Sequence, residues 1–285
     1  MYADCHIHMV LDGVNWKTAI ARHRQQPDRD YIRKTLEAYR NAGFTFLRDG
    51  GDRWGVGQAA RELAAEYGIT YRTPLAPLCA GGHYGGFIGE RYDSLKAYAE
   101  LVRKQKAQGA DFIKIMISGI MDFDHFGVLT EPGLDGETIR CLVDIAHQAG
   151  LAVMAHANGS RVVIAAAQAG VDSVEHGAYL NPEALEAMKT ARTVWVPTLS
   201  TIGNLRNRGR FSEPDVEEIL KSAVKNVRVF HQMGGILAPG TDAGAWAVPH
   251  GTLSEYALLR EALGEDADAA LADGIREIRD RFRRI

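Results

Sequence analysis

The sequence predicts an α/β protein folded as a closed (β/α)8 barrel, the TIM-barrel architecture. Short apolar runs alternate strictly with longer stretches of helical periodicity, a pattern typical of a parallel sheet with helices outside it. Eight such pairs follow one another, and a chain of 285 residues suits a barrel, which often takes about 250 residues. A six-stranded open sheet remains the alternative.

The predicted strands are short runs rich in β-branched and aromatic residues. In chain order they cover 2–8, 44–48, 69–77, 112–117, 152–156, 173–176, 194–197 and 236–239. The predicted helices cover 30–41, 57–67, 94–108, 134–149, 160–169, 182–189, 214–233 and 252–263. Several helices end at a glycine, such as Gly43 or Gly150, in a position typical of a left-handed cap.

The remaining tail, 265–285, is charged and helical in pattern. It is expected to be an outer helix or a contact for a partner, such as a second copy in a homo-oligomer. No low-complexity linker or shift in composition divides the chain, so residues 1–285 are predicted to form a single barrel domain.

Composition and charge exclude several classes of protein. The net charge of −3 provides no basic footprint for nucleic acid or for an acidic membrane surface. No signal peptide is recognisable, and no apolar run approaches the ~20 residues that span a bilayer. Three widely spaced cysteines argue for a reducing compartment and against a disulfide framework. We therefore expect a cytoplasmic protein that acts on a small molecule.

Histidines gather at the C-terminal ends of the predicted strands, where barrels of this kind carry their chemistry. His6 and His8 end the first strand and project from one face because they are two residues apart. His156 and His176 end the fifth and sixth strands. Each histidine alone is more often a core or surface residue, but together they match the ligand set of zinc and its neighbours.

Two further strand residues extend this pattern. Asp242, after the eighth strand, is either a helix cap or a carboxylate that contacts a metal and takes a proton from metal-bound water. Lys114 lies inside the apolar run 112–117, where an unpaired ammonium is costly. The alternatives are that it reaches solvent, forms a Schiff base, serves as a counter-ion, or reacts with CO₂ to form a carbamate that binds metal. A Schiff base leaves the histidines without a role, whereas a carbamate can bridge two metal ions.

Taken in order, these residues resemble the ligand pattern of the amidohydrolase superfamily: a histidine pair on strand one, a carboxylated lysine on strand four, histidines on strands five and six, and an aspartate on strand eight. The motifs at 43–51, 81–83, 169–177 and 197–200 are similar to the imidazolonepropionase-like and prolidase-like branch. The resemblance implies two divalent ions, zinc by type, whose bridging hydroxide attacks a carbonyl.

The same resemblance assigns the ligands. It places His6, His8 and Asp242 on one ion, His156 and His176 on the other, and carboxylated Lys114 between them; Asp242 would also carry the proton to the leaving group. Relatives of this branch usually add a β-sandwich built from both termini. In this sequence the first predicted strand begins at residue 2 and only the tail 265–285 follows the last helix, so we expect a barrel-only member.

Further candidates lie near these ligands. His83 or Tyr84, in the third loop, could stabilise an oxyanion. Arg48 either binds a substrate carboxylate bidentately or is structural, paired with an aspartate at position 49 or 52. Asn158 stands where prolidase-like members often carry a tyrosine, and it is a candidate substrate contact. Glu175 is expected to face the opposite side of its strand from the ligand beside it.

The leading prediction is a binuclear hydrolase of an amide, peptide or ester bond in a small molecule such as a dipeptide or an acyl-amino acid. A lactonase or phosphotriesterase would use the same ligands. A mononuclear deaminase of this superfamily typically lacks the strand-four lysine, so Lys114 argues against it. A metal-binding scaffold barrel would be expected to have lost a ligand, and all six positions are filled.

Overall fold

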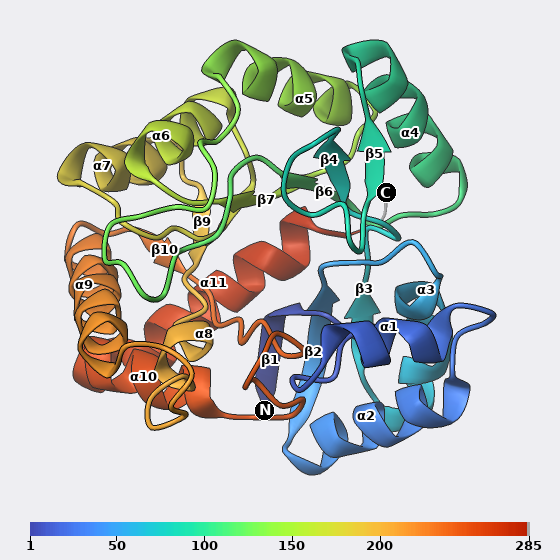
Figure 1. Cartoon of the computed structure of the whole chain (residues 1–285), viewed down its shortest axis with the longest axis horizontal. Coiled ribbons are helices and arrows are strands. Elements are labelled where there is room, and N and C mark those ends of the chain that lie inside the picture. The colour runs from blue at the N-terminus through green and yellow to red at the C-terminus, as the bar shows by residue number, and fades with distance from the viewer. Residues whose placement is uncertain (284–285) are drawn as a thin grey trace.

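In the computed structural model, which describes residues 1–283, a ring of helices surrounds parallel strands (Figure 1). The strands are β1 (Tyr2–Ile7), β2 (Phe44–Asp49), β3 (Thr70–Arg72), β4 (Leu78–Ala80), β5 (Glu90–Tyr92), β6 (Ile113–Met116), β7 (Val153–Ala157), β8 (Ser173–His176), β9 (Val194–Val196) and β10 (Ile236–Leu237). The α-helices are α1 (Trp16–His23), α2 (Arg29–Asn41), α3 (Val56–Ala64), α4 (Leu95–Ala107), α5 (Gly136–Gln148), α6 (Ser160–Ala169), α7 (Pro182–Thr190), α8 (Ser200–Gly203), α9 (Glu213–Gln232), α10 (Ser254–Leu263) and α11 (Ala267–Arg281). Two 3₁₀ turns, η1 (Ala65–Tyr67) and η2 (Gly264–Asp266), follow α3 and α10.

The strands form two parallel arcs that together close the barrel. One arc has the order β1-β2-β3, and the other has the order β10-β9-β8-β7-β6-β4-β5. Past the end of β10, the Cys5 N–H donates to the Pro239 carbonyl at 2.9 Å. The two arcs also meet between β3 and β6, where the Asp111 N–H, just before β6, donates to the carbonyl of Thr73, just after β3, at 3.0 Å. The predicted (β/α)8 barrel is confirmed, and the six-stranded open sheet is wrong.

The predicted strands and helices are all present, with the largest difference in the region predicted as one strand over 69–77. Pairing there stops after β3, and the chain passes Pro74 and Pro77, which have no N–H to donate to a ladder. Two short strands, β4 and β5, follow before α4. The sequence reasoning also missed α1, although Asn15 caps it by accepting from the backbone N–H groups of Lys17 and Thr18.

The barrel interior is filled by inward-facing side chains in layers, as in other barrels of this type. The lower layers are apolar and comprise Ala3, Cys5, Phe46, Phe112, Met154, Val194, Val196 and Ala238. Further along the same strands the inward positions become polar, because residues two apart share a face. On β6 the inward order is Phe112 and then Lys114, and on β7 it is Met154 and then His156. The polar layer therefore lies at the C-terminal end of the barrel.

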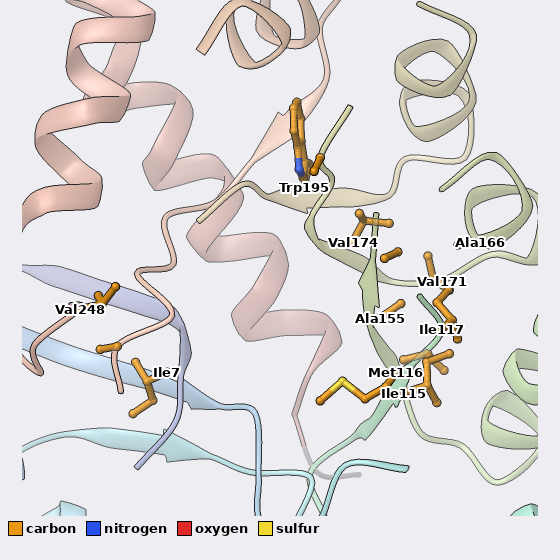
Figure 2. Packing of buried hydrophobic residues seen from close by; sticks show 14 of the residues in the cluster. Ile7, Ile115, Met116, Ile117, Ala155, Ala166, Val171, Val174, Trp195 and Val248 are labelled. Carbon is orange, nitrogen blue, oxygen red and sulfur yellow. The ribbon is translucent and has the colours of Figure 1, made fainter. Parts of the chain in front are cut away.

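A second, larger core packs the outer face of the strands against the helices. Ile115 of β6 is paired with Ala155 of β7, and both are fully buried. Figure 2 shows this part of the core, with Ala166 from the covering helix α6. Over residues 1–283, no helix is both long enough and apolar enough to cross a membrane.

The tail helix α11 closes the N-terminal end of the barrel. In Figure 1 it crosses behind the strands, and Ile278 and Phe282 pack into the interior core. A Cβ at Gly274 would overlap the carbonyl oxygen of Leu237, so this close approach requires glycine. The Arg48 guanidinium lies 4.3 Å from the Phe282 ring centroid. The tail is helical as expected but closes the end of the barrel, a contact with a partner stays a prediction, and residues 284–285 lie outside the described part of the chain.

Candidate metal centre

Three buried side chains form a compact cluster of metal-ligating atoms at the C-terminal end of the barrel. Asp242 Oδ1 lies 3.5 Å from His6 Nε2 and 3.3 Å from His8 Nε2. One ligand atom from each residue lies within 4.8 Å of the others. The pairing of β1 with β2 shifts register between Asp4 and Ile7, the kind of irregularity that re-aims side chains beside active sites.

Several atoms of this cluster lack a hydrogen-bond partner. Among the described residues, His6 Nε2, Asp242 Oδ1 and the nearby Lys114 Nζ are buried without one. Buried polar atoms are rarely left unpaired, so a group of them requires an explanation. A divalent ion bound by the two imidazoles and the carboxylate would satisfy the first two atoms, and the donor types suit zinc. The residues present therefore fit a metal site.

Two more imidazoles lie beside this cluster, each oriented by a second partner. His156 Nε2 lies 3.1 Å from the Gly119 carbonyl oxygen, which fixes the proton on Nε2 and leaves Nδ1 a free acceptor. His176 Nδ1 lies 2.8 Å from Thr198 Oγ1, which leaves Nε2 free. The two rings lie 4.6 Å apart between centroids, and the His6 ring lies 5.0 Å from that of His176. The structure thus brings together the four predicted histidines, and the sequence reasoning missed Thr198 as a partner.

Backbone strain is concentrated at the same strand ends. His176, Thr198 and Asp242 have φ values of 69°, 49° and 56°, in the left-handed region that non-glycine residues rarely adopt. Strain of this kind costs about 1–3 kcal/mol per residue and clusters at functional sites. Regular alternation turns Glu175 inwards together with Ser173, since both contact Arg48, and the angle at His176 turns that side chain inwards as well. The expectation that Glu175 faces away from the site is therefore wrong.

Burial shifts the charge states of these groups. Desolvation lowers the pKa of His8 and of His156 to about 3, so both imidazoles are neutral and able to bind a metal. Desolvation also lowers the pKa of Lys114 to about 8 and raises that of Asp242 to about 8. The lowered pKa makes the free amine of Lys114, the form that reacts with CO₂, more populated near neutral pH than for an exposed lysine.

Arg48 lies beneath the cluster and is fully buried. Its Nε donates to the Cys5 carbonyl at 2.7 Å, and Nη1 donates to Ser173 Oγ at 2.9 Å. Its Nη2 donates to Glu175 Oε1 at 2.9 Å, and the other oxygen of Glu175 lies 2.8 Å from His6 Nδ1. Arg48 does not line the cavity, which corrects its prediction as a substrate contact. Its acid partner is therefore Glu175, and the predicted pairing with an aspartate at position 49 or 52 is wrong.

A cavity of about 920 Å³ opens above the cluster. Tyr84 lines it, with its ring 4.8 Å from that of His156. His83 lies on the exposed side of the same loop, where its Nδ1 is 3.6 Å from Glu131 Oε1. The structure does not bring His83 to the cavity, because the loop turns its side chain towards solvent. Of the two predicted oxyanion contacts, only Tyr84 is therefore in position.

Asn158 also lines the cavity, but its amide is already used in hydrogen bonds. Its Nδ2 donates to the Gly119 carbonyl at 3.0 Å, and its Oδ1 accepts from the Ala178 N–H at 2.9 Å. Both Asn158 and His156 thus hold the same carbonyl group. The side chain positions the loop behind His156, and its role as a substrate contact stays a prediction.

The remaining lining comes from loops after several strands. In the loop 121–127, Phe123 lines the cavity and packs on Phe211 with centroids 5.3 Å apart, whereas Phe126 packs on Tyr179. The sequence reasoning missed Trp16, the first residue of α1, and Trp246, in the loop after β10, which both line the cavity.

Comparisons with known proteins agree with this geometry. The chain matches the Amidohydrolase family over residues 2–275. It is 26% identical over 276 residues to an ochratoxinase of Aspergillus niger, covering 84% of this chain and 56% of the relative. The chain therefore spans about half the length of this curated relative.

Solved structures of similar fold cover nearly the whole chain. A Xaa-Pro dipeptidase with bound methionine matches with a TM-score of 0.77 at 22% identity, over 97% of this chain and 74% of that one. A prolidase complexed with N-methylphosphonate-L-proline matches with a TM-score of 0.76 at 24% identity, over 99% of this chain and 74% of that one. These likenesses bear on the fold, and the match over residues 2–275 shows that the chain belongs to the amidohydrolase family.

Proposed function

We propose that this chain is a binuclear metal-dependent hydrolase that cleaves an amide, peptide or ester bond of a small molecule, such as a dipeptide or an acyl-amino acid. The observation that carries the proposal is the group of unpaired, buried ligand atoms of His6, Asp242 and Lys114 at the floor of a 920 Å³ cavity. The activities named for two similar proteins, a Xaa-Pro dipeptidase and an ochratoxinase, support a substrate of this kind.

Six residues would hold two divalent ions, which we propose to be zinc. One ion would be held by His6, His8 and Asp242, the second by His156 and His176, with Lys114 as a carbamate between the two. When bound, such a pair of ions supplies a hydroxide nucleophile at neutral pH and a Lewis acid for the substrate carbonyl.

The chain itself supplies the proton transfer and a hydrogen-bond donor. Asp242 is the proton carrier, because its buried carboxylate faces the cavity and is free to pass a proton to the leaving nitrogen or oxygen. Tyr84 donates a hydrogen bond to the developing oxyanion. Burial raises the pKa of Tyr84, so the phenol keeps its proton and remains a donor.

The experiment is hydrolysis by the zinc-loaded protein of a library of dipeptides, acyl-amino acids, lactones and phosphotriesters. We expect turnover of an amide or ester and a loss in kcat of about 10²–10³-fold in Tyr84→Phe, the size seen when one oxyanion donor is removed. The matched control is Tyr92→Phe, which removes a buried phenol that does not line the cavity. Turnover of phosphotriesters alone, or of no compound by metal-loaded protein, would overturn the proposal.

A further inference from the structure

The cavity above the candidate metal centre has a strongly aromatic wall. Its aromatic lining residues come from the segments after five different strands and comprise Trp16, Tyr84, Phe87, Phe123, Phe211 and Trp246. Several are packed on one another, with centroids 5.5 Å apart for Trp16 and Phe87 and 5.9 Å apart for Phe211 and Trp246. Pre-packed rings of this kind bind a flat or bulky apolar group with little loss of side-chain entropy.

One cation on this wall is available for an anion. The guanidinium of Arg210 lies 4.4 Å from the Trp246 ring centroid and 5.2 Å from that of Phe211. Neighbouring arginines are engaged by the chain: Arg206 lies 3.9 Å from Glu217, and Arg208 Nε donates to a backbone carbonyl at 3.2 Å. Within residues 1–283, Arg210 lies on the two rings without an acid partner, and its hydrogen-bonding edge is free.

Other charged groups at the cavity do not compete for this role. Asp122 also lines it, but its Oδ2 lies 3.0 Å from His125 Nδ1. Arg48 is buried beneath the site and paired with Glu175. Lys17 lines the cavity near the first loop, but its ammonium is a point charge, whereas a stacked guanidinium offers a planar fork that matches a carboxylate.

The loop that carries Arg210 is tied to the opposite side of the cavity. The Ser212 N–H donates to Asp124 Oδ1 at 3.0 Å, and the adjacent Phe211 packs on Phe123. These contacts of the two residues after Arg210, and the two rings against its guanidinium, restrict its position and reduce the cost of ordering it on binding.

We propose that Arg210 is the specificity-determining residue that binds a carboxylate of the substrate, while the aromatic wall holds an apolar or aromatic portion of the same molecule. The substrate class is then an amide or ester of an acid with a free carboxylate, such as an acylated aromatic amino acid. This inference rests on the proposed hydrolase function. Arg210 takes the carboxylate-binding role in place of Asn158 and Arg48, because polar groups of those two side chains are hydrogen-bonded within the fold.

The test compares substrates that differ only in charge: an N-acyl-phenylalanine and its C-terminal methyl amide. In Arg210→Met we expect KM for the carboxylate substrate to rise about 10–100-fold, from the loss of a charged hydrogen bond, with kcat and the neutral substrate nearly unchanged. Arg208→Met is the matched control, since it removes a charge from the same loop outside the cavity lining. Equal losses for both substrates, or none for the carboxylate, would overturn the inference.

A binding measurement keeps this inference separate from the hydrolytic function. Calorimetric titration with phenylacetate and with phenylacetamide needs no turnover. We expect phenylacetate to bind more tightly to the wild-type protein, and Arg210→Met to abolish that preference. If the preference is absent, or survives in Arg210→Met because the carboxylate binds elsewhere, Arg210 is not the carboxylate site, even where amides are hydrolysed.

Discussion

Replacing Arg48 by methionine should destabilise the fold strongly without acting directly on the substrate. Both Arg48 and Glu175 are fully buried, and their charged groups lie 2.9 Å apart. Methionine keeps much of the aliphatic volume, including the packing near Phe282, but removes the charge and its hydrogen bonds. Removing one partner of a buried ion pair leaves the other charge uncompensated, which costs about 3–5 kcal/mol.

The double variant separates the ion pair from simple packing. In Arg48→Met/Glu175→Gln the stranded carboxylate is neutral, so we expect it to recover part of the stability lost by Arg48→Met, with a coupling energy above about 1 kcal/mol. Glu175→Gln alone should also weaken zinc binding about 10–100-fold, because Glu175 contacts the Nδ1 side of His6.

Urea unfolding followed by circular dichroism measures these stabilities, and a zinc-competition titration measures the affinity. The structural role of Arg48 is refuted if Arg48→Met loses less than about 1 kcal/mol of unfolding free energy while KM for carboxylate substrates rises. That outcome would restore Arg48 as a substrate contact.

Two further predictions concern regions away from the cavity. Gly274→Ala should destabilise the protein by at least about 1 kcal/mol in thermal unfolding, because its Cβ would overlap the Leu237 carbonyl and push α11 from the barrel; a variant as stable as wild type would contradict this packing. His147→Asn should lower stability at pH 5.5 more than at pH 8.5. The hydrogen bond to Asp172 raises the pKa of His147 in the folded protein. The resulting stabilisation is fully present below the pKa of His147 in the unfolded chain, and it is lost as pH rises through the pKa in the folded protein. Because the side chains of His147 and Asp172 are partly exposed, the loss of unfolding free energy in urea titrations should differ by about 0.2–1 kcal/mol between the two pH values. Equal losses at both pH values would refute this prediction.

The barrel and its polar strand ends could be predicted because their signals are local. The run at 173–176 is bounded by turn residues and gives β8 without error. On β6, the alternation of Phe112, Ile113 and Lys114 already implies that the lysine faces inwards with the phenylalanine. Histidines at such positions converge in any closed parallel barrel, which is why the candidate site was visible in the sequence.

The rest depends on contacts between distant residues and on unusual backbone angles. Arg48 and Glu175 are 127 residues apart, and no local pattern distinguishes Glu175 from two nearer aspartates as the partner. The left-handed angle at His176 cannot be expected for a non-glycine residue, and it brings His176 to the same side of the strand as Glu175. Likewise, the amphipathic pattern of α11 does not indicate whether it covers the side of the barrel or closes its end.

The most direct test of the account is the metal content of the purified protein and of Lys114→Ala. Lys114 is fully buried in a polar layer with four imidazoles, and its amine has no hydrogen-bond partner among residues 1–283. If Lys114 bridges the site as a carbamate, elemental analysis should find two divalent ions per chain in the wild type, falling to one or none in Lys114→Ala with loss of hydrolysis. Full metal content and full activity in Lys114→Ala would contradict the account.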